Sequence, residues 1–260
     1  YIYKPDLTMT TAKTRQRLVI GNWKMNGSLA ANEVLLKGIR EGVENAGAPV
    51  NCTIAVCPSF PYLVQVSQAL AGSPVSWGAQ DVSLQESGAF TGEVSAAMLN
   101  DFNCAWALVG HSERRALHGE TSEQVALKAK EALAHHITPV VCVGETLQDR
   151  EQGNTLAVIQ AQLAPVLALG EQAVNKMVIA YEPVWAIGTG LTASPEQAQE
   201  VHAYIRAQLN AIGAGNVQIL YGGSVKAANA GSLFAMNDID GALVGGAALV
   251  AEEFLNIATA

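Results

Sequence analysis

Eight short apolar segments recur along the chain, and this pattern limits its fold more than any other feature. Each segment is nearly continuous in apolar or β-branched residues, which is typical of strands in a parallel sheet covered on both faces. They occupy residues 17–23, 51–57, 75–79, 104–110, 138–144, 176–182, 217–222 and 240–245. Helical patterns lie between most of them, without a polar linker. We therefore expect an α/β fold, a single (β/α)8 barrel of eight parallel strands with outer helices; a doubly wound sheet is the alternative.

Capping patterns place two helix starts. Ser194 and Gln197 form the ends of a predicted capping box, and Pro195 suits the first helical turn behind Ser194. The sequence TSEQ, which begins at Thr121, has the same pattern. Both predicted helices follow an apolar segment, as the alternating fold requires.

Composition narrows the class of protein. The 260 residues are 50% hydrophobic and 15% charged, enough for one large core or two modest ones. No apolar run reaches the ~18 residues of a membrane helix, and residues 1–17 lack the apolar centre of a signal peptide, so we expect a soluble cytoplasmic protein. The net charge of −8 disfavours nucleic acid and anionic membranes as partners and fits small metabolites better.

The expected domain boundaries are simple. Residues 17–260 are predicted to form the catalytic barrel, and residues 1–16 an N-terminal extension. The residues before Met9 are either native or an expression-vector remnant, and the sequence leaves both open.

Cysteine and histidine spacing does not indicate a metal site. The four cysteines lie in or beside apolar segments without CxxC spacing, so we expect reduced core thiols: Cys52, Cys57, Cys104 and Cys142. Four of the five histidines are expected to be solvent-exposed on polar helix faces or helix ends: His118, His135, His136 and His202.

The chemically suggestive residues follow the predicted strands. Barrel enzymes work from the loops at the carboxyl ends of their strands. Asn22 and Lys24 follow the first segment, His111 follows the fourth, and Glu182 ends the sixth, where Pro183 stops regular pairing. His111 also begins a helical turn, whose free N–H groups disfavour a charged imidazolium. We expect these side chains on one rim, with His111 neutral and able to donate a hydrogen bond.

Glycine pairs follow the last two segments. YGGSVKAAN (221–229) and VGGAAL (244–249) each place two glycines between a strand and a helix start, so backbone N–H groups there can approach an anion closely. Together they resemble a phosphate cup. GTGLTA (188–193) matches a relaxed dinucleotide fingerprint, but its helix opens only at Ser194, and no acidic residue occurs in residues 201–237 to hold a ribose. We interpret this glycine-bearing loop as a lid over Glu182.

Six segments, in order between residues 18 and 254, resemble the triosephosphate isomerase family: GNWKMN, GAFTGEVSAAML, VGHSERR, YEPVWAIGTG, YGGSV and DGALVGG. The resemblance implies the TIM barrel and the interconversion of dihydroxyacetone phosphate and D-glyceraldehyde 3-phosphate in glycolysis and gluconeogenesis, without cofactor or metal.

Catalytic roles are carried over from this resemblance. Glu182 would be the base that moves a proton through an enediolate, and neutral His111 would polarise the carbonyl. The family is a well-known example of pKa tuning, so this pair of assignments is not a new deduction. Lys24 would be the essential cation, and Asn22 would add a hydrogen-bond donor.

The resemblance also implies supporting roles. Ser112 would hold Glu182 while the lid is open, Glu113 would position Lys24, and Tyr221 with Ser224 would latch the closed lid. Backbone amides of Gly188, Ser224, Gly245 and Gly246 would grip the phosphate. The lid would comprise Pro183, Val184, Trp185, Ala186, Ile187, Gly188, Thr189, Gly190, Leu191, Thr192 and Ala193. Many relatives carry Lys where Leu191 stands, so the free energy of lid closure is not expected to follow from the resemblance.

The loop of residues 80–93 is too long for an ordinary strand-to-helix connection and carries Phe90, expected to be exposed. By resemblance, Thr91 would reach into a partner subunit near Asn22 and His111, so we expect a homodimer. A loop packed only on its own subunit is the alternative.

Two other functions stay open. One is another phosphate-binding barrel isomerase or lyase, which would not need Lys24, His111 and Glu182 together. The other is a barrel-fold binding or adhesion protein with secondary or lost isomerase activity.

Overall fold

The structure is a computed structural model that describes residues 15–46 and 51–260. Most of the predicted N-terminal extension, residues 1–14, therefore lies outside the described residues. Within the described ranges, no helix is both long enough and apolar enough to cross a membrane.

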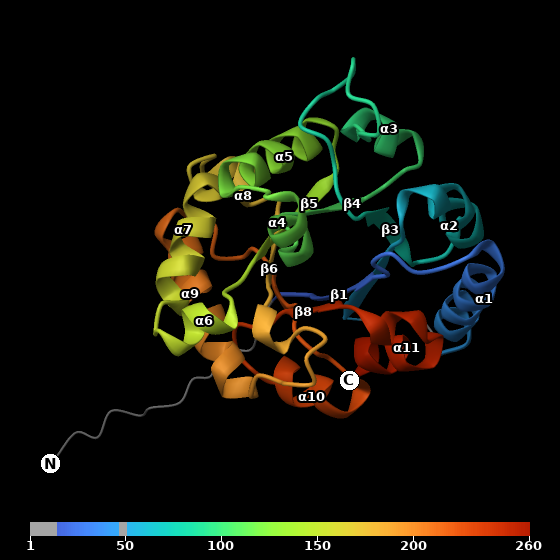
Figure 1. The fold of residues 1–260 in the computed structure, drawn as a ribbon. Helices are drawn as coiled ribbons and strands as arrows, with labels where there is room; N and C mark the ends of the chain where they lie inside the picture. Colours follow the sequence, from blue (N-terminus) through green and yellow to red (C-terminus); the bar gives the residue numbers. More distant parts are fainter. Residues whose placement is uncertain (1–14, 47–50) are drawn as a thin grey trace, which may run out of the picture.

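Eight parallel strands close into a barrel in their order along the chain (Figure 1). The strands are β1 Arg17–Asn22, β2 Cys52–Cys57, β3 Ser76–Ala79, β4 Trp106–Val109, β5 Thr138–Val143, β6 Val178–Tyr181, β7 Ile219–Tyr221 and β8 Gly241–Val244. β1 pairs with both β2 and β8, which closes the ring. Every predicted apolar segment contains one strand. The barrel prediction is confirmed, and the doubly wound alternative is wrong.

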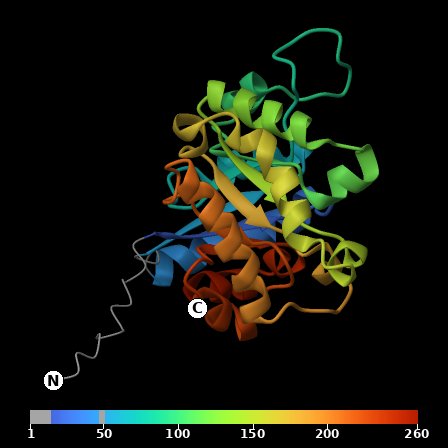
Figure 2. The same ribbon diagram turned by 90° about the vertical axis from the view of Figure 1, so that its left-hand side faces the viewer.

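Helices surround the strands on the outside (Figures 1 and 2). They are α1 Leu29–Ala46, α2 Leu63–Leu70, α3 Ala96–Asp101, α4 Ser112–His118, α5 Ser122–Ala134, α6 Leu147–Glu151, α7 Thr155–Leu167, α8 Glu171–Val174, α9 Pro195–Ala211, α10 Ala227–Phe234 and α11 Ala251–Thr259. Short 3-10 turns are η1 Phe60–Tyr62, η2 Val184–Ala186 and η3 Gly246–Leu249. Both predicted capping boxes, at Thr121 and Ser194, are present.

The strands separate two hydrophobic cores. Alternate strand residues such as Leu18, Ile20 and Leu108 fill the barrel interior. Their neighbours, such as Val19 and Val109, face the helices in the larger outer core. This is the packing expected for a barrel whose interior is filled with side chains.

All four cysteines are buried and free, as predicted: Cys52, Cys57, Cys104 and Cys142. Burial raises the pKa of the Cys52 thiol to about 11 and that of the Cys104 thiol to about 12. The thiols therefore stay protonated at neutral pH and act as core side chains.

The segment between β3 and α3 projects beyond the ring of helices in both views (Figures 1 and 2). Its base is tied down because Ser83 N–H donates to Val94 O at 2.8 Å. Closer to β3, Asp81 accepts from Lys128 Nζ at 2.7 Å and pairs with Arg114. Phe90, near the tip, is 45% exposed, as predicted.

The prediction for His202 is wrong. Its side chain is fully buried on α9, with Nδ1 3.1 Å from Asp238 O and the ring edge-on to Tyr181. His202 lies four residues after Ala198 and three before Ile205, both buried, so helical spacing places it on the inward face. Burial lowers the pKa of His202 from 6.5 to about 4. The polar side chain of His202 suggested exposure, whereas its spacing along the helix indicated burial.

The low pKa of His202 predicts a pH-dependent stability. The unfolded chain binds this proton near pH 6.5 and the folded chain only near pH 4, so the free energy of unfolding should fall between these values as pH decreases. The contribution is about 3 kcal/mol by linkage. In urea unfolding between pH 7 and pH 4, the free energy of unfolding should decrease less steeply with falling pH in His202→Gln than in the wild type. The exposed-residue control His118→Gln should keep the wild-type slope; an equal slope in His202→Gln would contradict the assignment.

Candidate active site

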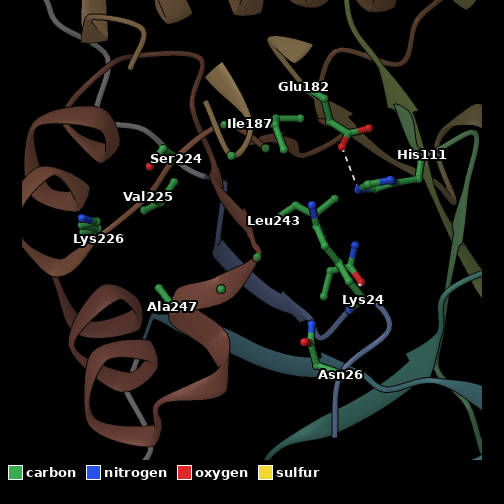
Figure 3. A pocket seen from close by; sticks show the side chains of 16 residues that line it. Lys24, Asn26, His111, Glu182, Ile187, Ser224, Val225, Lys226, Leu243 and Ala247 are labelled. Carbon is green, nitrogen blue, oxygen red and sulfur yellow. Dashed lines mark hydrogen bonds and ion pairs between the residues drawn. The ribbon is translucent and has the colours of Figure 1, made fainter. Parts of the chain in front are cut away.

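A cavity of about 450 Å³ opens at the carboxyl ends of the strands. Its lining includes every residue that sequence analysis named as catalytic or substrate-binding: Asn22, Lys24, His111, Glu182, Gly188, Ser224, Gly245 and Gly246. They come from the ends of β1, β4, β6, β7 and β8 or the loops that follow. In Figure 3, Glu182, His111 and Lys24 lie on one side of the cavity, with Ser224, Lys226 and Ala247 on the other.

Glu182 follows β6 directly and is 1% exposed. Its backbone N–H donates to Val143 O at 2.7 Å, which continues the pairing with β5. Gly144 and Gly222 lie against it on the two sides. A Cβ atom on Gly144 would overlap Glu182 O, and one on Gly222 would lie 2.9 Å from Glu182 Cγ. The close approach of both neighbouring strand ends therefore requires glycine.

The Glu182 carboxylate is held by three donors. Ser112 N–H donates to Oε2 at 3.0 Å, and Ser112 Oγ donates to Oε1 at 3.2 Å. His111 Nε2 lies 2.9 Å from Oε1 (Figure 3). Burial raises the pKa of Glu182, but contacts with His111 and Ser112 outweigh it, so the net pKa lies below the ordinary value. Glu182 is thus ionised at neutral pH although it is buried.

His111 is the N-cap of α4. Its Nδ1 accepts a hydrogen bond from Glu113 N–H at 3.2 Å, so a neutral ring carries its proton on Nε2, toward Glu182. Burial lowers the pKa of His111, whereas the Glu182 charge raises it and leaves it above the ordinary value while the two touch. The tautomer is fixed by the helix start, and the protonation depends on where Glu182 lies.

Lys24 has a constrained backbone and a paired side chain. Its φ of 52° is uncommon for a residue other than glycine. Neighbours hold this conformation, because Lys24 N–H donates to Asn22 Oδ1 at 2.9 Å and Lys24 O accepts from Gln80 Nε2 at 2.8 Å. Nζ lies 2.6 Å from Glu113 Oε1, the partner expected for it. The amine is thereby fixed at the cavity wall.

The opposite wall is formed by the loops after β7 and β8. Ser224 lies in the loop before α10, and Gly245 is the N-cap of the turn that starts at Gly246. Gly222 and Gly223, the paired glycines of the predicted phosphate cup, also line the cavity. Five further lining residues had no predicted role: Asn26, Val225, Lys226, Leu243 and Ala247. Of these, Lys226 could have been found, because it directly follows the YGGSV segment.

The predicted lid, residues 183–193, begins with η2 and has an exposed tip. Trp185 Nε1 donates to Glu145 Oε1 at 2.9 Å, and Thr189 Oγ1 donates to Trp185 O at 2.6 Å. Thr189 Oγ1 also accepts from Leu191 N–H at 3.2 Å. Ile187 and Gly188 line the cavity, whereas the Leu191 side chain is exposed.

Tyr221 is the last residue of β7, within the predicted apolar segment 217–222, and is fully buried. Burial raises its pKa, the Ala193 backbone lowers it, and the result is about 12. The hydroxyl therefore lies near the end of the lid, although it makes no hydrogen bond of normal geometry with a described residue.

Phe90 and Thr91 are exposed on the projecting loop and do not line this cavity. In the part of the chain that the structure describes, no group of three or more His, Cys, Asp or Glu side chains is arranged to hold a metal ion.

Comparisons with known proteins agree on one family. The family model described as triosephosphate isomerase matches residues 17–260. The triosephosphate isomerase of Bordetella pertussis (strain Tohama I) is 64% identical over 252 residues, which cover 97% of this chain and 100% of the relative. That of Cupriavidus taiwanensis is 59% identical, with 95% and 100% covered, and that of Delftia acidovorans is 56% identical, with 95% and 99% covered.

Proposed function

The chain belongs to the triosephosphate isomerase family, and from this premise we propose how its own residues interconvert dihydroxyacetone phosphate and D-glyceraldehyde 3-phosphate, the glycolytic reaction of that family. The observation that carries the proposal is the convergence of Glu182, His111 and Lys24 on one cavity with two glycine-bearing loops. We further propose that the same isomerisation serves gluconeogenesis in reverse, and that the enzyme works in the cytoplasm.

Glu182 is the proposed base. Its carboxylate takes a proton from C1 of the ketose, the C–H electrons form the enediolate double bond, and the proton returns at C2 to give the aldose. Both carboxylate oxygens accept hydrogen bonds from Ser112 or His111. Glu182 must therefore leave these donors to reach the substrate, and Ser112 marks its resting position.

His111 is the proposed electrophile. Its Nε2–H is aimed into the cavity because Nδ1 is occupied by Glu113 N–H. When Glu182 moves onto substrate, the contact that raises the His111 pKa is removed, and burial favours the neutral ring. A neutral Nε2–H can then donate to the substrate carbonyl and shuttle protons between the two oxygens.

Lys24 and Asn22 are proposed to stabilise negative charge. The Lys24 ammonium offsets both the phosphate and the growing oxyanion, and Glu113 holds it in place. Asn22 Oδ1 already accepts from Lys24 N–H, so its Nδ2 group is the end that donates to the substrate oxygen. No cofactor is needed, because the proton only moves within the substrate.

The phosphate group is proposed to bind to backbone amides of Gly188, Ser224, Gly245 and Gly246. Closure of residues 183–193 would exclude water, which matters because an enediolate phosphate can expel its phosphate group in water. Tyr221 and Ser224 are the proposed latches. Leu191, whose side chain is exposed, is proposed to alter the energetics of closure.

The binding-protein and lyase alternatives receive less support. Each would tolerate the loss of at least one of Lys24, His111 and Glu182, yet all three line the same cavity. A secondary binding role stays a hypothesis.

Glu182→Asp tests the base. The substitution withdraws the carboxylate by one methylene, so kcat should fall by about a hundredfold or more while KM changes little. A coupled assay with glyceraldehyde 3-phosphate measures both. The exposed control Glu200→Asp, on α9, should behave as the wild type. Near-normal turnover in Glu182→Asp would remove the base assignment.

Lys24→Met tests the cation. The change keeps most of the side-chain length but removes the charge, so activity should disappear while the far-ultraviolet circular dichroism spectrum stays that of the wild type. The control Lys37→Met removes an exposed surface amine on α1 and should leave activity intact. A collapsed spectrum in Lys24→Met would instead identify a structural lysine.

A homodimer is the proposed active form. Phe90 is 45% exposed on the projecting loop, and Met25, directly after Lys24, is 95% exposed. Met98 on α3 is also exposed. A contiguous patch of exposed apolar side chains marks a protein interface, and these three residues are proposed to belong to one such patch. Thr91 would enter the partner subunit near its cavity.

Thr91→Arg tests this interface, because an arginine inserted there would place a bulky charge in a closed contact. Analytical ultracentrifugation should give a monomer, and Thr259→Arg, on the exposed end of α11, should give the wild-type state. A stable Thr91→Arg dimer would mean that the proposed interface is wrong.

A further inference from the structure

We propose that Gln162, on α7, is a positioning residue for Glu182: its carboxamide holds the Gly144 peptide against which the Glu182 backbone rests. This inference rests on the proposed role of Glu182 as the base. Gln162 does not line the main cavity and has no role in the mechanism above.

The need for such a residue arises where two strands separate. β4 and β5 pair as far as Val109 and Val141. The chain then leaves β4 for His111 and α4, whereas β5 continues to Val143. The backbone of residues 142–144 therefore extends beyond the last residue that pairs with β4. Backbone N–H and C=O groups that lose a strand partner need another one.

Two helix side chains supply these partners. Arg115, on α4, donates from Nη2 to Cys142 O at 3.1 Å and from Nε to Gly110 O at 2.8 Å. Gln162 accepts from Gly144 N–H at 2.7 Å through Oε1 and donates to Gly144 O at 3.0 Å through Nε2. A carboxamide has the same donor and acceptor as a peptide group. Gln162 thus replaces the missing strand neighbour at Gly144.

Gly144 is in direct contact with the base. Glu182 N–H donates to Val143 O at 2.7 Å, and Val184 N–H donates to Glu145 O at 3.1 Å, so the two bonds flank Gly144. The fit is tight enough that a Cβ atom on Gly144 would overlap Glu182 O. A displacement of the Gly144 peptide must therefore move the Glu182 backbone, because no flexible side chain lies between them.

Packing leaves free space beside Gly144 on the side away from the main cavity. A second cavity of about 260 Å³ lies on this side of the site, lined by Arg115, Gly144, Gln162 and Glu182 among others. The segment has room to shift if the two hydrogen bonds from Gln162 are lost. The loops after β7 and β8, which form the opposite wall of the main cavity, do not line this second one. A defect at Gln162 should thus disturb proton transfer more than phosphate binding.

The test compares Gln162→Met with Gln160→Met in the full chain. Methionine keeps the length of glutamine without its hydrogen bonds, and Gln160 is an exposed residue two positions earlier on α7. Since a misplacement of about 1 Å can cost about a hundredfold in rate, Gln162→Met should lower kcat by about tenfold to a hundredfold. KM for glyceraldehyde 3-phosphate and the affinity for inorganic phosphate should stay within about twofold. Gln160→Met should match the wild type.

Gln162→Glu provides rescue by a conservative variant. A protonated carboxyl group donates and accepts as a carboxamide does, whereas the ionised form has no donor for Gly144 O. The kcat of Gln162→Glu relative to the wild type should therefore rise as pH falls from about 8 to about 5. The same ratio for Gln162→Met should not depend on pH. A merely structural role would not produce this difference.

The outcomes separate the positioning role of Gln162 from the base role of Glu182. If the wild type is active and Gln162→Met keeps its kcat within about twofold, the positioning role is wrong. It is equally wrong if kcat, substrate affinity and phosphate affinity all fall together, or if only the melting temperature changes, because Gln162 would then be structural. If Glu182→Asp retains near-normal turnover, the base assignment itself fails, and this inference fails with it.

Discussion

Closure of the parallel barrel is the constraint on which the site depends. β1 pairs with β2 and β8, so the first and last strands are neighbours and all eight carboxyl ends share one rim. Residues as distant in sequence as Asn22 and Gly246 can then line one cavity. An open sheet would separate the loop after β1, which carries Lys24, from the turn after β8, which carries Gly246, and these residues would not line one cavity.

Charged side chains at the cavity form two contacts, one between Lys24 and Glu113 and one between Glu182 and His111. The protein carries a net charge of −8, so an anionic ligand must be attracted locally. Lys24 and Glu113 form a pair that can persist, because it only positions the amine. In the proposed mechanism, the pair of Glu182 and His111 has to break, because the proposed base must reach the substrate carbon. The low pKa of Glu182 keeps the carboxylate charged in its resting position, where Ser112 also holds it.

Sequence predicted the fold and the members of the cavity well, because both depend on local signals. Apolar segments gave the strands, and residue types at their carboxyl ends gave Lys24, His111 and Glu182. The errors concern side-chain environment. His202 looked polar but belongs to the buried face of α9, and Tyr221, predicted to be a lid latch, is fully buried at the end of β7. Gly144 and Gln162 were not identified, because their role depends on a contact between a strand end and a helix that sequence spacing does not encode.

At both ends of the barrel, side chains bond to backbone groups that lack a neighbouring strand. At the amino-terminal end, Arg206 donates to Gly215 O and Val217 O, and Asp240 accepts from Ile219 N–H, so side chains complete the backbone pairing before and at the start of β7. At the carboxyl end, Arg115 and Gln162 complete it at the end of β5 and in the residue after it. At the amino-terminal end these bonds support the fold and do not adjoin the main cavity. At the rim that carries the cavity, the supported backbone lies against Glu182, so the same kind of bond would also fix the geometry of the proposed proton transfer. In this proposal, the precision of the site depends partly on helix side chains that do not line the main cavity.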